Sequence, residues 1–407
     1  MNAISKYLKN YAEKEVSFSK AISKKFDACV VVPAHREDEY LFQFLSSLKL
    51  ASKNRSILCI LVLNGKESEQ DFHQKILNKL EASLFSEFQL FIVDRATGKN
   101  IFSDKEGVGL ARKIGCDLAL QLIVENKILS PWIRCSDADV LLPSDYFEDP
   151  NFSKSTSAFH YSFFHQPENS HIQDALSVYE ESLYYYLWGL NFANSSYAFH
   201  SVGSTIGIHY EKYAEVRGFP KVEAGEDFYV LNKLAKVGRI EISSTSPICI
   251  SGRASDRVPF GTGAGIQKIL ETWQDKKEFC FYHPEIFLGL KVWLQELALC
   301  EQNISIEDLK SRLENQAPIG SQCIEVAEQL GLFEALRRLP LKPHSPPINR
   351  EHLRAWFDGF KTLKFLHCFR DLHRPSISYL EALYLAEPMG YKAFICKQPP
   401  KMTSALT

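Results

Sequence analysis

Residues 28–37 read ACVVVPAHRE. They begin with an unbroken apolar run that ends at a proline, and polar residues follow. Residues 57–63 form a similar run that ends in Asn64-Gly65. Residues 88–93 form a third run, and residues 132–135 form a shorter fourth. Continuous rather than alternating apolarity is typical of strands that are covered on both faces, as in a parallel sheet.

Amphipathic segments lie between these runs. Apolar residues recur with helical spacing after Asp38 and again from Gly107 onward. Strands that alternate with helices predict an α/β sandwich with a mostly parallel central sheet. Ligands of such sheets bind at the carboxyl ends of the strands, so we expect the chemistry there.

The chain has 407 residues, which is more than one ordinary compact core accommodates. Strand patterns fade after about Tyr282, and helical patterns follow at 288–299, 306–313, 324–338 and 352–367. We therefore expect three segments. They are a polar, helical N-terminal extension (1–25), an α/β catalytic unit (26–281) and a helical C-terminal region (282–407).

Composition excludes several classes of protein. The net charge of -2 gives no bulk electrostatic reason to expect a nucleic-acid partner. The ten cysteines are scattered without CxxC spacing, which argues against a zinc cluster and for a reducing compartment. No apolar run is long enough to span a bilayer. We expect a soluble, cytoplasmic protein, and peripheral membrane contact stays open.

The strongest chemical signal is Ser136-Asp137-Ala138-Asp139, which directly follows an apolar run. Two carboxylates at this spacing can bind one Mg²⁺ or Mn²⁺, which prefers oxygen ligands and leaves room for a diphosphate. Such an ion would neutralise charge on a departing nucleotide diphosphate. A solvated turn is the alternative interpretation, because aspartate is common in turns.

Gly225-Glu226-Asp227 opens a predicted helix over 228–237. One interpretation is helix capping, since the macrodipole favours carboxylates in the first turn. The other is a general base that takes a proton from an acceptor hydroxyl. We predict that Asp227 is this base, kept ionised by the helix amides, and that Glu226 assists by hydrogen bonding.

Two glycine-containing segments complete the pattern. Residues 107–115 (GVGLARKIG) superficially echo a dinucleotide fingerprint, but the spacing differs and no strand ends immediately before them. Residues 251–265 (SGRASDRVPFGTGAG) place Arg253 and Arg257 in a loop of small residues. Arginines in such a loop suit phosphate oxygens, and an ordinary surface loop is the alternative.

In this order, the segments resemble the family 2 glycosyltransferases with the GT-A fold. Residues 31–37 are similar to the family's opening strand and its P-A-x-x-E turn, and residues 107–115 to its G-x-x-x-A-R-x-x-G helix entry. Residues 136–139 are similar to the D-x-D metal motif, and residues 216–227 to the G-G-F-x…E-D segment. The resemblance covers roughly residues 26–265.

The resemblance implies a nucleotide-sugar-binding sandwich that transfers one sugar from a UDP- or GDP-sugar, with Mn²⁺ or Mg²⁺ as cofactor and the acceptor unspecified. The Q-x-x-R-W motif of processive members is absent, which favours single transfer. Asp227 corresponds to the usual base of inverting members. With the loop arginines, the residues expected at the nucleotide sugar are Pro33, Ala34, Glu37, Asn64, Gly107, Arg112, Asp137, Arg253 and Arg257.

Two departures and two alternatives remain. Asn64 stands where the family often has an acidic residue, and Arg217 replaces the first glycine of its G-G-F segment. A metal-dependent nucleotidyltransferase is one alternative, although its loop after the first strand is typically glycine-rich and residues 33–37 contain no glycine. A catalytically silent nucleotide-sugar-binding protein, with a helical region that recruits partners, is the other.

Overall fold

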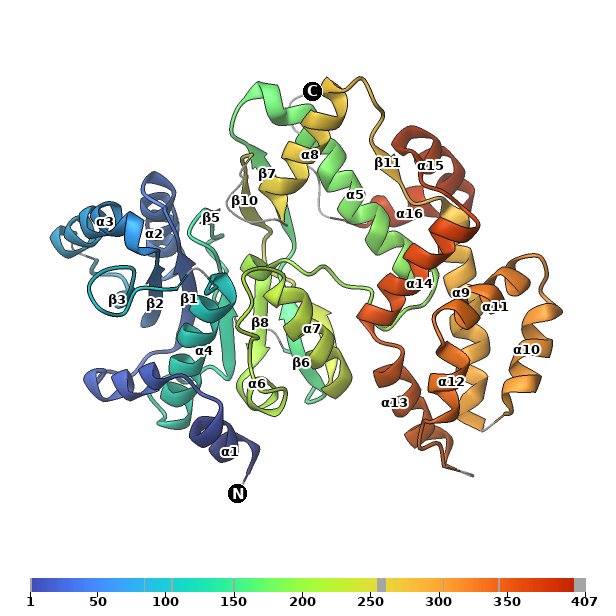
Figure 1. The fold of residues 1–407 in the computed structure, drawn as a ribbon. Helices are drawn as coiled ribbons and strands as arrows, with labels where there is room; N and C mark the ends of the chain where they lie inside the picture. Colours follow the sequence, from blue (N-terminus) through green and yellow to red (C-terminus); the bar gives the residue numbers. More distant parts are fainter. Residues whose placement is uncertain are drawn as a thin grey trace. The chain divides into compact units, whose positions relative to one another are not determined.

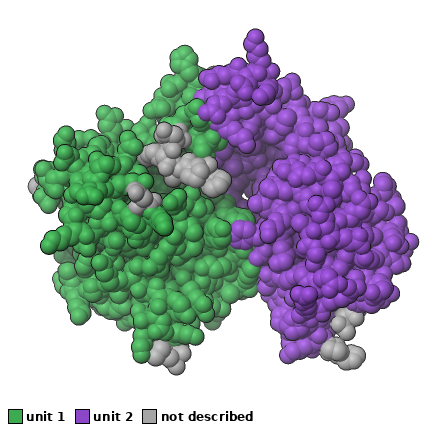
Figure 2. Space-filling model, viewed as in Figure 1, with its two compact units in different colours: residues 1–176, 201–267, 399–407 green, residues 177–200, 268–398 purple. Residues whose placement is uncertain are grey.

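The structure, a computed structural model, describes residues 2–83, 85–103, 105–148, 151–254, 261–302, 304–342 and 345–398. It forms two compact units (Figure 2). Unit 1 contains Met1–Leu176 and Ser201–Gln267, and unit 2 contains Ser177–His200 and Lys268–Gln398. Every predicted site residue that the structure describes belongs to unit 1.

The centre of unit 1 is a seven-stranded sheet with the strand order β3-β2-β1-β4-β8-β6-β9 among the described residues (Figure 1). The first four strands in this order are parallel to one another. Strand β8 is antiparallel to both of its neighbours, and β9 is parallel to β6. The strands are β1 (Ala28–Ala34), β2 (Ile57–Asn64), β3 (Gln89–Arg95), β4 (Trp132–Cys135), β6 (Thr156–His160), β8 (Ile206–His209) and β9 (Arg239–Ile242).

The register of the central strands brings their carboxyl ends to one edge of the sheet. Every residue of β1 and β2 is buried, as expected for strands covered on both faces. Ala34 at the end of β1 lies opposite Leu63 of β2, and Val31 lies opposite Cys135 at the end of β4. The polar residues that follow these strands are therefore neighbours in space.

Helices and a small second sheet complete unit 1. Helix α4 is buried over most of its length and packs on β1 and β2. The second sheet has the order β5-β10-β7. The helices are α2 (Glu39–Ala51), α3 (Gln70–Ala82), α4 (Val108–Val124), α6 (Tyr210–Glu215) and α7 (Glu226–Val237), with the short 3-10 helices η2 (Glu67–Glu69), η3 (Ser170–Ile172) and η4 (Gly203–Thr205). The small sheet contains β5 (Val140–Leu141), β7 (Phe163–Pro167) and β10 (Ile248–Gly252).

The N-terminal segment packs on α4. It forms α1 (Ala3–Asn10) and the 3-10 helix η1 (Lys14–Ala21). The fully buried carboxylate of Asp117 accepts hydrogen bonds from the hydroxyls of Tyr7 and Tyr213 and from the ammonium of Lys113. The backbone N–H of Glu13 donates to the same carboxylate at 2.9 Å. A buried carboxylate needs such partners, so the segment expected as a polar extension is part of unit 1.

Unit 2 is almost entirely helical. Its core includes Trp293, whose ring lies within 6 Å of the rings of Phe333, Phe357 and Phe365. Its helices are the greater part of α5 (Gln173–Phe192), the end of α8 (Thr262–Gln274), α9 (Pro284–Leu299), α10 (Ile306–Glu314), α11 (Ile319–Gln329), α12 (Leu332–Arg337), α13 (Pro346–Trp356), α14 (Gly359–Leu372), α15 (Tyr379–Ala386) and α16 (Tyr391–Ile395). The 3-10 helices η5 (Cys300–Gln302) and η6 (Glu387–Met389) and the strand pair β11 (Cys280–Phe281) and β12 (Ile377–Ser378) complete it.

The expected fold class is confirmed, because the structure is a mixed α/β fold with a mostly parallel sheet and a helical C-terminal region. The helix expected over 324–338 differs in detail, since Gly331 adopts a φ of 64° and separates α11 from α12. Unit 2 also takes in residues 177–200, because Tyr185 of α5 packs its ring 5.1 Å from that of Phe281. Within the described ranges, none of the helices combines the length and apolarity needed to cross a bilayer.

Candidate functional site

Arg112 joins two of the predicted motifs. Its side chain extends from α4 and is 1% exposed. Its Nη2 donates a hydrogen bond to Oδ1 of Asp137 at 2.7 Å, and its Nε donates to Oε1 of Glu226 at 3.0 Å. A third bond runs from Nη1 to the carbonyl oxygen of Ser136 at 3.2 Å. The planar guanidinium therefore holds the end of β4 and the start of α7 in one geometry.

Close backbone packing makes room for Arg112. A Cβ atom on Gly203 would lie 2.8 Å from Nη2 of Arg112, so a larger residue would displace the guanidinium. Gly107, at the entry of α4, faces the backbone of Glu223, where a Cβ would lie 2.8 Å from Cα. In this structure Gly107 thus serves close packing between the α4 entry and the segment that leads to Glu226.

The charges of this cluster are compensated. Burial by itself lowers the pKa of Arg112, but Asp137 and Glu226 outweigh burial and raise the pKa well above its usual value. The guanidinium therefore stays charged. Glu226 is 4% exposed and has this cation as its ion-pair partner, which is what a buried carboxylate requires.

Asp227 follows Glu226 in the first turn of α7 and is half-buried. Burial raises the pKa of Asp227, the neighbouring charge of Glu226 raises it further, and the result is a pKa of about 7. The backbone N–H of Phe228 donates to its Oδ1 at 2.7 Å and opposes the shift. The backbone amide favours the ionised carboxylate, as expected for the first turn of a helix, but desolvation and like charge outweigh it. A pKa near 7 suits a proton acceptor at neutral pH.

Arg253 joins a second pair of predicted residues. It follows β10, and its Nη2 donates to Oδ2 of Asp139 at 2.9 Å and also to Oε1 of Glu37. Its guanidinium carbon lies 4.3 Å from the ring centroid of Tyr40, within cation–π range. Asp137 and Asp139 are two residues apart, so the cluster at Arg112 and the cluster at Arg253 are adjacent. Arg257 lies outside the described residues.

The ends of β1 and β2 supply the remaining predicted residues. Pro33 and Ala34 close β1, and both are buried. Asn64 closes β2 with 5% of its surface exposed, and its Oδ1 has no hydrogen-bond partner among the described residues. An unsatisfied buried amide oxygen costs about 1–3 kcal/mol, so a ligand that donates a hydrogen bond there would be favoured.

The Asp137 and Asp139 carboxylates fit a hard divalent cation. Their side chains are 36% and 20% exposed, so an ion can reach both from solvent. Oδ1 of Asp137 accepts the bond from Arg112, and Oδ2 of Asp137 accepts none among the described residues, so this second oxygen is open to an ion. Carboxylate oxygens are the donors that Mg²⁺ and Mn²⁺ prefer.

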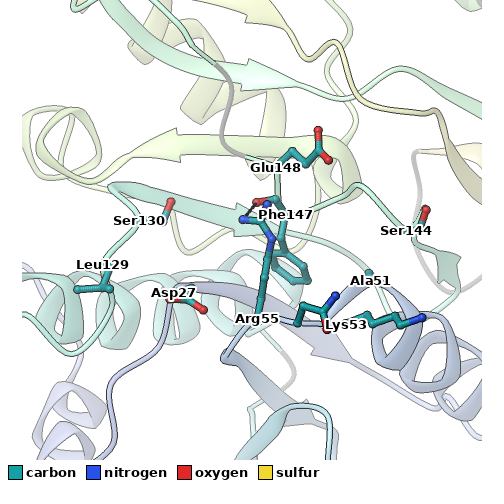
Figure 3. Close-up of a pocket in the computed structure, with 10 residues that line it drawn as sticks. Asp27, Ala51, Lys53, Arg55, Leu129, Ser130, Ser144, Phe147 and Glu148 are labelled. Atoms are coloured by element: carbon teal, nitrogen blue, oxygen red, sulfur yellow. Dashed lines mark hydrogen bonds between the residues drawn. The ribbon is translucent and has the colours of Figure 1, made fainter.

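A pocket of about 660 Å³ lies at the opposite edge of the sheet (Figure 3). It is lined by Asp27, Arg55 and Ser130, which precede β1, β2 and β4, respectively. Arg55 is held there by the hydrogen bond from its Nη1 to the carbonyl oxygen of Phe147 at 2.9 Å. Ligands of parallel sheets bind at the carboxyl ends of strands, so this pocket is not the candidate active site.

Two polar side chains at the carboxyl edge of the sheet, Glu69 and His73, were not predicted from the sequence. Glu69 and His73 come from η2 and α3 and lie beside His35, which follows β1. Only His35 belonged to a predicted motif. The spacing of four residues between Glu69 and His73 was the available signal, because such residues share one face of a helix.

The sequence matches no protein-family model, and no curated protein sequence matches it significantly. Solved structures show loose likenesses. The S. aureus TarS 1–349 complex with UDP is 10% identical, covers 81% of this chain and 89% of its own, and has a TM-score of 0.38. The mannosyltransferase PcManGT from Pyrobaculum calidifontis, in complex with GDP-Man and Mn²⁺, is 14% identical, with coverages of 88% and 92% and a TM-score of 0.35.

A third structure, glucosyl-3-phosphoglycerate synthase from Mycobacterium tuberculosis in complex with UDP, is 11% identical. It covers 64% of this chain and 82% of its own, with a TM-score of 0.31. All three TM-scores are below 0.5.

Proposed function

We propose that this chain is a metal-dependent glycosyltransferase that moves a single sugar from a UDP- or GDP-sugar to an acceptor hydroxyl, with inversion. The observation that carries the proposal is the pair of bonds from Arg112 to Asp137 and Glu226. Through one buried guanidinium, these bonds link the carboxylate expected at the diphosphate to Glu226 of the acidic pair expected at the acceptor. The sequence resemblance to family 2 glycosyltransferases supplies the reaction class.

In the proposed reaction the acceptor oxygen attacks the anomeric carbon while the bond from that carbon to the diphosphate oxygen breaks. The electron pair of the broken bond leaves with the nucleoside diphosphate, and the acceptor proton passes to Asp227. The pKa of about 7 allows Asp227 to accept this proton near neutral pH. Attack from the face opposite the leaving group inverts the configuration.

Asp137 and Asp139 would hold Mg²⁺ or Mn²⁺, which stabilises negative charge on the leaving diphosphate. Arg112 positions Asp137 and Glu226, because its guanidinium forms an ion pair with each of them, and movement away from one carboxylate would also change the bond to the other. Arg253 sets the position of Asp139 relative to Glu37 in the same way. The nucleotide would lie along Pro33, Ala34 and Asn64, where the unsatisfied Oδ1 of Asn64 can accept a hydrogen bond from it.

A donor screen tests the proposal. The protein is incubated with a panel of UDP- and GDP-sugars and Mn²⁺, and products are identified by mass spectrometry, with Asp227→Asn as the matched inactive control. No acceptor is added, so water takes the sugar, and we expect the wild type to release nucleoside diphosphate and free sugar from one class of donor faster than Asp227→Asn does. In a parallel incubation with nucleoside triphosphates and sugar phosphates, release of pyrophosphate would instead favour the nucleotidyltransferase. Binding of a nucleotide sugar without turnover would favour the silent binding protein.

A further inference from the structure

His35, Glu69 and His73 form a cluster at the ends of β1 and β2. One ligand atom from each side chain lies within 4.8 Å of the ligand atoms of the other two. The Nε2 atom of His35 is 2.9 Å from Oε2 of Glu69, and Nε2 of His73 is 4.0 Å from the same oxygen. The two imidazole rings are stacked, with centroids 6.2 Å apart. Three side chains from three segments thus converge on one small volume.

His73 is the residue that needs explanation. It is 1% exposed, and neither ring nitrogen has a hydrogen-bond partner among the described residues. A buried polar group without a partner costs about 1–3 kcal/mol. Gly65, immediately after β2, packs closely on the His73 ring, where a Cβ atom would lie 2.4 Å from Nε2. The chain therefore keeps an imidazole nitrogen buried, unsatisfied and directed toward the cluster.

We propose that His35, Glu69 and His73 bind one Zn²⁺ ion. Two imidazoles and one carboxylate form a ligand set typical of zinc, whereas Mg²⁺ and Mn²⁺ prefer all-oxygen sites. With bonds of about 2.0–2.1 Å, the ligand atoms of a tetrahedral zinc ion lie about 3.4 Å apart. The distances of 2.9 Å and 4.0 Å from Glu69 lie on either side of this value, and all three ligand atoms lie within 4.8 Å of one another, so the side chains would shift and the rings would reorient on binding the ion. A water molecule would complete the fourth position.

The ion would tie the loop after β1 to helix α3. Glu37 follows His35 by two residues and holds Arg253, which in turn contacts Asp139. Fixing His35 therefore fixes the loop that positions these charged residues. The zinc ligands are different residues from Asp137 and Asp139, so zinc binding and the proposed glycosyl transfer can be tested separately.

Zinc binding is measured on the full chain after metal is removed with a chelator. A competition titration with a chromophoric chelator should show one tight Zn²⁺ site in the wild type. Glu69→Gln and His35→Asn, which change partly exposed side chains, should each lose this site. Asp139→Ala and the exposed-histidine control His171→Asn should keep it.

Cobalt substitution and thermal unfolding give independent measurements. Co²⁺ should produce visible d–d bands in the wild type, without a near-ultraviolet thiolate charge-transfer band, and Glu69→Gln should lack these bands. Zn²⁺ should raise the Tm of the wild type and leave that of Glu69→Gln unchanged. The proposal is overturned if the wild type binds no zinc, if both ligand variants retain it, or if a thiolate band assigns the metal to cysteines.

Discussion

Nε of Arg112 lies 3.0 Å from Oε1 of Glu226, although 114 residues separate them in the sequence. Both side chains are buried, so this ion pair is shielded from the water and salt that weaken surface pairs. This ion pair fixes the position of the backbone as well as compensating charge. The start of α7, which carries Asp227, is anchored to the same cation that orients Asp137.

Arg112→Met should destabilise the protein strongly. The substitution keeps apolar bulk and leaves the carboxylate of Glu226 buried without its cation, a change that typically costs about 3–5 kcal/mol. Urea unfolding measures the free energy. The double variant Arg112→Met/Glu226→Gln should recover part of this loss, because it removes the uncompensated charge. If the two substitutions are simply additive, the coupling between these residues is not as we describe it.

Asp227→Asn should lower the transfer rate about 10²–10⁴-fold while donor affinity is kept. The amide has the same shape but cannot accept the acceptor proton. Steady-state kinetics and calorimetric titration with donor separate the two effects. Glu226→Gln should cost less, since Glu226 acts through Arg112, and the exposed Glu223→Gln is the surface control. An Asp227→Asn protein with normal turnover would place the base elsewhere.

The pKa of about 7 at Asp227 predicts a pH dependence. Because the base must be deprotonated, the transfer rate should rise with pH through about 7.

The same group affects stability, because the folded-state pKa of Asp227 is raised above that of the unfolded chain. The contribution of Asp227 to folding stability is therefore fully present below the unfolded pKa and is lost as pH rises through 7. Thermal unfolding of metal-free protein should therefore show that Asp227→Asn gains stability relative to wild type between pH 5 and pH 8. An equal difference at both pH values contradicts this assignment.

Arg253→Ala should raise the KM for the donor more than it lowers kcat. Removing the guanidinium releases Glu37 and Asp139 from their shared partner, so two carboxylates near the expected diphosphate lose their compensating charge. The exposed Arg239→Ala is the matched control for loss of one positive charge. Unchanged KM in Arg253→Ala would mean that this arginine has no role in donor binding.

Tyr7→Phe should destabilise unit 1 by about 1–3 kcal/mol, because it removes a hydroxyl that donates to buried Asp117 and accepts from Lys113. Tyr11→Phe is the control, since its hydroxyl makes no hydrogen bond among the described residues. Differential scanning calorimetry measures both variants. Equal stability of Tyr7→Phe and wild type would show that the N-terminal segment is not anchored through this network.

Local sequence was sufficient for the strongly patterned elements. The apolar runs at 28–32, 57–63 and 132–135 became β1, β2 and β4, and the helix expected from Gly107 became α4. These elements are predictable because a strand buried on both faces has a continuous apolar run, and a helix buried on one face has apolar residues at helical spacing. The parallel character of the central sheet followed from their alternation.

The short strands β6, β8 and β9 were not predicted individually. Four or five residues carry too little periodicity, and their pairing depends on partners far along the chain. The same reason applies to the helix end at Gly331, where backbone conformation rather than apolar pattern separates α11 from α12.

By itself the sequence determined which residue types stand at these positions: carboxylates after β4, a proline near the end of β1, and an acidic pair at the start of α7. Only the tertiary structure decided their partners and their protonation. The bridge from Arg112 to Asp137 and Glu226, the raised pKa of Asp227 and the convergence of His35, Glu69 and His73 all depend on distance and burial. Electrostatic energies vary with both quantities, and neither can be read from residue order.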